Sequence, residues 1–136
     1  MVNMIIDGKH VSAEENITIM EAAERNGIPI PKLCYLKGIN EIAACRVCVV
    51  ELEGKEKLIT SCNNLVKEGM VIHTNSPKVR NHRRNTVQLL LSQHDNRCVV
   101  CPRNGNCGLQ QVAYDLNILE IPFKQEPEYQ PWDKNF

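Results

Sequence analysis

Four cysteines in the first half of the chain are the feature that most constrains its fold. They are spaced Cys34-x10-Cys45-x2-Cys48-x13-Cys62, with no other cysteine among them. Four thiolates that converge on one point can hold a structural zinc ion or an iron-sulfur cluster, because both bind soft, negatively charged sulfur in a tetrahedral arrangement. The spacing therefore predicts a metal centre built from loops that are distant in the sequence.

The pattern favours iron over zinc. Zinc ribbons usually bring two Cys-x2-Cys pairs to one ion, whereas here a single pair, Cys45 and Cys48, is flanked by two lone cysteines. Plant-type 2Fe-2S sites space their first three ligands Cys-x4-Cys-x2-Cys, so the close pair matches but the first gap does not. The complete pattern resembles the 2Fe-2S domain at the N-terminus of iron-only hydrogenases and of the large iron-sulfur subunit of respiratory NADH dehydrogenase.

A second group of potential ligands follows, spaced His94-x3-Cys98-x2-Cys101-x5-Cys107. A lone histidine near a helix end is more often a surface or capping residue than a ligand. A cubane cluster needs four protein ligands, however, and the chain has no eighth cysteine, so His94 is the nearest additional donor. The spacing is similar to the histidine-ligated 4Fe-4S motif of the same two families, in which it directly follows the 2Fe-2S domain.

Local patterns in the first part of the chain predict a small sheet and one helix. Asp7-Gly8 is a strong hairpin signal, Thr18 and Glu21 fit a capping box at a helix start, and Gly27 stands where a left-handed C-cap belongs. From this helix, Ile19, Met20, Ala22 and Ala23 are expected to face the sheet. Strands are expected at residues 2–6, 9–12, 48–52, 57–61 and 70–73. This order is typical of the β-grasp fold of 2Fe-2S ferredoxins.

A longer helix is predicted to begin at Ser76-Pro77, an N-cap followed by proline at the first helical position, and to run to about Ser92. Its basic residues are interpreted as a solvated face, with docking of an acidic partner as the alternative; they are Lys78, Arg80, His82, Arg83 and Arg84. Another helix is expected after Cys107 because apolar residues repeat there at helical spacing.

The expected fold class is α+β, and the chain is expected to have three parts. These are a β-grasp 2Fe-2S ferredoxin-like domain at residues 1–74, a small helical 4Fe-4S domain with one histidine and three cysteine ligands at 75–117, and an irregular tail or linker at 118–136. The tail is predicted from its prolines, which disfavour regular structure.

Composition excludes several classes of function. Lys plus Arg and Asp plus Glu number 16 each, so the chain lacks the basic excess of a general nucleic-acid-binding protein. The sequence has no basic signal region and no stretch near the roughly 18 apolar residues of a membrane span. We therefore expect a cytoplasmic protein without a transmembrane segment, whose seven cysteines are metal ligands rather than disulfides.

The resemblance implies an electron-transfer module with two cofactors and no catalytic residue of its own. The implied ligands are Cys34, Cys45, Cys48 and Cys62 for one 2Fe-2S cluster, and His94, Cys98, Cys101 and Cys107 for one 4Fe-4S cluster. Electrons would pass between a flavin-containing, NAD(P)H-oxidising partner or a ferredoxin and the redox centres of a hydrogenase-type complex. The chain would then be a small subunit or an N-terminal segment of such an oxidoreductase.

Four alternatives stay open at this point. The parent enzyme could be a NAD-linked formate dehydrogenase or a complex-I-like oxidoreductase, although the short first gap favours a hydrogenase. A structural or interaction module with two zinc ions would be colourless, whereas iron-sulfur clusters are brown. A thiol enzyme that uses one Cys-x2-Cys pair would leave five cysteines unexplained.

Overall fold

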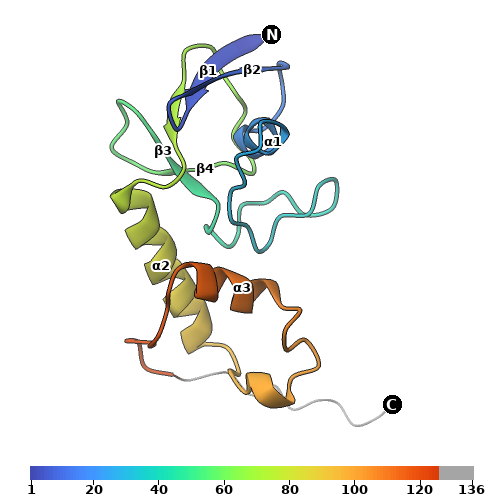
Figure 1. Cartoon of the computed structure of the whole chain (residues 1–136), viewed down its shortest axis with the longest axis vertical. Helices are drawn as coiled ribbons and strands as arrows, with labels where there is room; N and C mark the ends of the chain where they lie inside the picture. Colours follow the sequence, from blue (N-terminus) through green and yellow to red (C-terminus); the bar gives the residue numbers. More distant parts are fainter. Residues whose placement is uncertain (126–136) are drawn as a thin grey trace. The chain divides into compact units, whose positions relative to one another are not determined.

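The computed structural model describes residues 1–125, and the chain divides within its longest helix into a first unit, Met1–Thr86, and a second unit that begins at Val87 (Figure 1). Among the described residues, no helix is both long and apolar enough to cross a membrane. Of the irregular tail expected at residues 118–136, the part from 126 onward lies outside the described residues.

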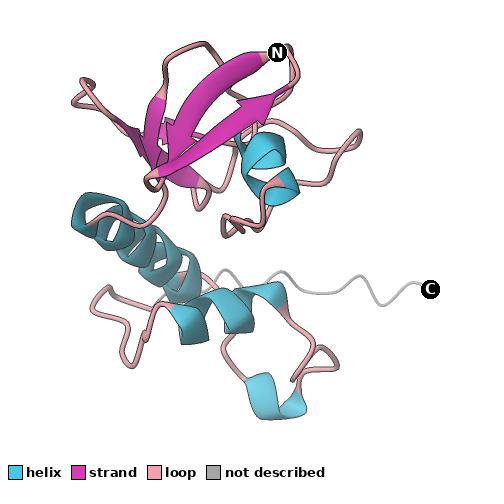
Figure 2. Ribbon diagram, turned by 45° about the horizontal axis from the view of Figure 1, so that its top comes forward, coloured by secondary structure: helices cyan, strands magenta, loops and turns pink. Residues whose placement is uncertain are grey.

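A five-stranded mixed sheet forms the frame of the first unit (Figure 2). Its strands are β1 (Val2–Ile6), β2 (Lys9–Ala13), β3 (Val49–Leu52), β4 (Ile59–Thr60) and β5 (Val71–His73). They lie in the order β2-β1-β5-β3-β4; β1 and β5 are parallel, and the other pairs are antiparallel. The predicted α+β, ferredoxin-like fold class is confirmed.

The β1–β2 hairpin turns at Asp7-Gly8, as predicted. Both residues have positive φ, 49° and 81°, as a type I′ turn requires. The Asp7 carboxylate also accepts hydrogen bonds from the backbone N–H of Thr74, at 2.8 Å, and from its hydroxyl. The turn therefore also fixes the chain just after β5.

Helix α1 (Ile19–Arg25) supplies one wall of the core and lies against the sheet (Figure 2). Its four expected core residues are buried. Thr18 accepts the Glu21 N–H at 3.2 Å, but the Glu21 carboxylate binds Arg25 and Lys37, each at 2.7 Å, rather than closing a capping box. The helix ends in a Schellman motif, in which Gly27 has a φ of 73° and its N–H bonds the carbonyl of Glu24.

Three helical segments follow the sheet, namely α2 (Pro77–Ser92), the short 3-10 helix η1 (Cys98–Val100) and α3 (Gly108–Asp115). The predicted start of α2 is confirmed, since the Ser76 hydroxyl accepts the Val79 N–H at 3.3 Å. The interpretation of the basic run as a solvated face is wrong at one position, because Arg83 is only 2% exposed. Lys78, Arg80, His82 and Arg84 are exposed, as expected.

Candidate metal centres

The first candidate centre lies where the loop after α1 meets β3 and β4. Cys34 and Cys45 come from that loop, Cys48 immediately precedes β3 and Cys62 follows β4. Cys48 and Cys62 are each 1% exposed and belong to the hydrophobic core, whereas Cys34 and Cys45 are partly exposed. The site thus extends from the core to the surface of the first unit.

Strand pairing brings the two buried cysteines to the same end of the sheet. Val49 pairs with Thr60, which places Cys48 next to the segment that contains Cys62. The carbonyl of Cys48 accepts two hydrogen bonds from Ser61, one from its N–H at 3.1 Å and one from its hydroxyl at 2.7 Å. These contacts fix the backbone segments that carry the Cys48 and Cys62 side chains.

The four thiols of the first centre influence one another. The backbone N–H of Cys45 donates to the sulfur of Cys34 at 3.4 Å. The pKa of Cys62 is raised to about 12, first by burial and then by a hydrogen bond with Cys48 and the negative charges of the three other thiolates. Four neighbouring thiolates therefore repel one another unless positive charge is supplied between them, as a metal centre would do.

The loop around Cys45 favours a thiolate at that position. Burial opposes ionisation of Cys45, but the backbone N–H groups of Val47, Cys34 and Leu33 outweigh it, so that its pKa is lowered. On either side of Cys45, Ala43 and Arg46 have positive φ, at 54° and 60°. Non-glycine residues adopt this conformation at a cost and persist in it where the surrounding structure requires it. The loop is therefore shaped to present backbone donors to sulfur.

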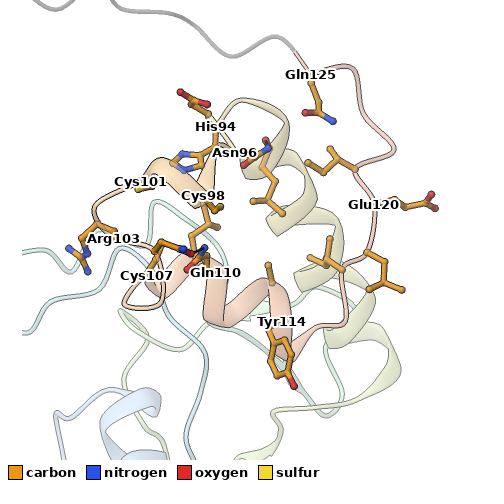
Figure 3. Close-up of a pocket in the computed structure, with 18 residues that line it drawn as sticks. His94, Asn96, Cys98, Cys101, Arg103, Cys107, Gln110, Tyr114, Glu120 and Gln125 are labelled. Atoms are coloured by element: carbon orange, nitrogen blue, oxygen red, sulfur yellow. Dashed lines mark hydrogen bonds between the residues drawn. The ribbon is translucent and has the colours of Figure 1, made fainter.

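The second candidate centre is a cavity of about 820 Å³ in the second unit. All four candidate ligands line it: His94 after α2, Cys98 and Cys101 at the two ends of η1, and Cys107 at the N-terminus of α3. Figure 3 shows them gathered on one side of the pocket, with Tyr114 and Glu120 farther away. His94 and Cys101 are exposed, and Cys98 and Cys107 are partly buried.

A glutamine that the sequence analysis did not identify holds the loop between Cys101 and Cys107. Gln110 on α3 accepts the N–H of Gly105 at 3.0 Å and donates to the side chain of Asn104 at 2.9 Å. Gln110 also lines the cavity (Figure 3). The sequence did contain one indication that Gln110 faces this loop. The residue lies three positions after Cys107, in the first turn of the predicted helix.

The donor sets fit the two expected clusters. All seven cysteines are free thiols. Within residues 1–125, no group of three or more His, Cys, Asp and Glu side chains is arranged to hold a single metal ion. A cluster does not need such a group, because its four protein ligands are divided among several irons, two per iron in a 2Fe-2S cluster and one per iron in a 4Fe-4S cluster.

Both parts of the chain match known sequence families. Residues 1–77 match the family described as "2Fe-2S iron-sulfur cluster binding domain", and residues 83–122 match the "NADH-ubiquinone oxidoreductase-G iron-sulfur binding region". The two matches have the same order along the chain as the two candidate centres, and each contains the four candidate ligands of one centre.

Among curated relatives, NADP-reducing hydrogenase subunit HndD of Solidesulfovibrio fructosivorans is 47% identical over 90% of this chain and 22% of its own length. The alpha subunit of NADPH-Fe(3+) oxidoreductase of Geobacter sulfurreducens is 42% identical over 88% of this chain and 14% of its own length. A subunit of the NADH-quinone oxidoreductase of Rhizobium meliloti is 38% identical over 91% and 14%. The chain thus spans less than a quarter of each of these relatives.

A solved structure shares the fold. The NAD+-reducing NiFe-hydrogenase in its H2-reduced state superimposes with a TM-score of 0.85 and 27% sequence identity. The superposition covers 96% of this chain and 54% of the hydrogenase chain. The likeness therefore extends over both units of the chain and about half of the hydrogenase chain.

Proposed function

Because the chain belongs to the family of 2Fe-2S iron-sulfur cluster binding domains, we propose that it is the electron relay of an NAD(P)-linked, hydrogenase-type oxidoreductase complex. The predicted cofactors, one 2Fe-2S cluster and one 4Fe-4S cluster, and the predicted role as an iron-sulfur electron-transfer module are confirmed by the two matched regions. The identity of the larger enzyme that contains the relay is a proposal, and so is the assignment of the residues that bind the clusters.

We assign the 2Fe-2S cluster to the first centre. Its proposed ligands are Cys34, Cys45, Cys48 and Cys62. The mutual charge effect of the four thiols supports this assignment, as does the set of backbone donors around Cys45. Burial of Cys48 and Cys62 keeps water from one side of the site, while the partly exposed Cys34 and Cys45 leave the other side accessible to a redox partner.

We assign the 4Fe-4S cluster to the second centre, with His94, Cys98, Cys101 and Cys107 as its proposed ligands. The observation that carries this assignment is the single cavity that all four side chains line. A neutral imidazole in place of a fourth thiolate makes the site less negative, which favours the reduced form relative to a four-cysteine site in the same surroundings.

When bound, each cluster accepts and donates one electron at a time. The protein's part is then to hold the ligands, exclude water and set the charge around each site, and no side chain of this chain has to make or break a substrate bond. Chemistry on NAD(P)(H) would belong to a partner, which we propose to be a flavin-containing subunit. The free thiols suit a reducing compartment, and we propose a cytoplasmic location.

The runner-up parents are a complex-I-like oxidoreductase and a NAD-linked formate dehydrogenase. The similarity to a subunit of an NADH-quinone oxidoreductase favours the first of these over the second. The higher identity to an NADP-reducing hydrogenase subunit keeps the hydrogenase-type assignment first.

Anaerobic iron and sulfide analysis of the reconstituted chain tests the proposal. We expect six irons and six acid-labile sulfides per chain, two from the first centre and four from the second, together with a brown colour. Coulometric titration should register two electrons per chain, one for each cluster. Saturation at two irons would remove the second centre, and preferential uptake of two zinc ions with no electron uptake would overturn the proposal.

A further inference from the structure

Arg83 is the one charged side chain that is fully buried among residues 1–125. Its guanidinium donates from Nε to the carbonyl of Val47 at 2.8 Å, and from Nη2 to the carbonyl of Val49 at 2.9 Å. A third, longer contact of 3.4 Å reaches the carbonyl of Thr74. Arg83 therefore binds the backbone on both sides of Cys48.

These acceptors bind Nε and Nη2 of Arg83 but carry no formal charge. No ion pair within the described residues involves Arg83. A buried charge is costly unless an opposite charge lies nearby, and an arginine cannot avoid the cost by losing its proton at neutral pH. A negative charge close to Arg83 would lower this cost.

Cys48, one of the proposed ligands of the first centre, supplies such a charge when it is ionised. Burial lowers the pKa of Arg83, and the negative charge of Cys48 acts in the opposite direction. Of the four proposed ligands, Cys48 is the one whose two neighbouring carbonyls Arg83 holds. The Arg83 guanidinium is thus held against the stretch of backbone that carries the Cys48 thiol.

We propose that Arg83 is a positioning residue that raises the reduction potential of the 2Fe-2S centre by placing a buried positive charge beside Cys48. This inference rests on the assignment of the 2Fe-2S cluster to Cys34, Cys45, Cys48 and Cys62. One-electron reduction by an external donor such as a reduced flavin adds one negative charge to the site and involves no proton. A fixed positive charge in a buried, low-dielectric position stabilises that added charge more than it stabilises the oxidised state.

A purely structural role would be to tether the loop through the three carbonyls, so the test must separate charge from tethering. Arg83→Gln removes the charge and keeps a donor of reduced reach. Arg83→Lys keeps the charge but loses the planar fork that binds two carbonyls at once. Arg80→Gln is the matched control, because Arg80 lies on the same helix with its side chain exposed.

The experiment is a redox titration of the full reconstituted chain, followed by electron paramagnetic resonance of both clusters. We expect Arg83→Gln to lower the equilibrium constant for reduction of the 2Fe-2S cluster at least tenfold, which is about 59 mV for one electron. Arg83→Lys and Arg80→Gln should stay near the native value, and the 4Fe-4S potential should not change in any variant.

An unchanged 2Fe-2S potential in Arg83→Gln would overturn the inference. If Arg83→Gln fails to load the cluster, the Arg83→Lys variant separates the two roles. A near-native 2Fe-2S potential in Arg83→Lys supports the role of charge. A lowered potential or a lost cluster shows that Arg83 acts by tethering the loop. Absence of any 2Fe-2S signal in the unmodified chain would instead refute the proposed site itself, so the two failures are distinguishable.

Discussion

Replacement of His94 by alanine is the sharpest test of the second centre, because His94 is the proposed fourth ligand beside three cysteines. His94 is exposed, follows α2 and lines the cavity that the three cysteines share. Removing an exposed side chain changes the free energy of unfolding little, by about 0.5 kcal/mol or less. Iron content should nevertheless fall from six to two per chain, because the four irons of the second centre lose a ligand.

The assay combines iron and sulfide analysis with electron paramagnetic resonance of the reduced protein and thermal unfolding of the metal-free chain. His94→Ala should lose the 4Fe-4S signal, keep the 2Fe-2S signal and unfold within a few degrees of the native chain. Three histidines outside the cavity serve as controls and should be replaceable without loss of iron: His10, His73 and His82.

A full complement of six irons with unchanged potentials in His94→Ala would refute the assignment. The fourth ligand would then be a water or Asp95, whose carboxylate contacts Arg97 at 2.6 Å in this structure. His94→Cys refines the test, since a thiolate in place of imidazole adds a negative charge. If that variant keeps the cluster, its reduction potential should fall.

Two further predictions concern the first centre and its independence. Cys62→Ser should lose mainly the 2Fe-2S signal, because all four proposed ligands of that centre lie in the first unit. Loss of both signals in electron paramagnetic resonance would show that the two sites depend on each other. In the metal-free chain at pH 8, Cys45 should be alkylated well before Cys62, because a thiol with a pKa of about 12 holds roughly a thousandth of the thiolate of an ordinary cysteine. Mass spectrometry of alkylated peptides measures the order, and equal rates would contradict the electrostatic description of the site.

The features that could be predicted from the sequence are those set by a few adjacent residues. The Asp7-Gly8 turn, the Thr18 cap and the start of α2 after Ser76 each depend on backbone conformations and hydrogen bonds within four residues, so the local sequence contains the cause. The two sets of candidate ligands stay predictions, made because the spacing of cysteines limits which loops can reach one cluster.

Features that depend on tertiary packing were missed. The Glu21 carboxylate was expected to close the capping box, but it pairs instead with Arg25 on the same helix and with Lys37 from the loop after α1, each at 2.7 Å. Gln110 likewise acts on a loop whose path only the folded chain defines. Lys37 and the loop that Gln110 binds are brought into place by the fold rather than by the adjacent sequence.

Arg83 is the instructive case, because the sequence contained the information needed to place it. It lies in a run of basic residues, and charge alone predicted a solvated face. Val79 and Val87, both fully buried, lie four residues before and after it, so all three share one face of α2. A cation at such a position must find hydrogen-bond acceptors inside the protein, and Arg83 finds them in the carbonyls on both sides of Cys48. Helical periodicity, applied to charged residues as strictly as to apolar ones, would have predicted that Arg83 is buried.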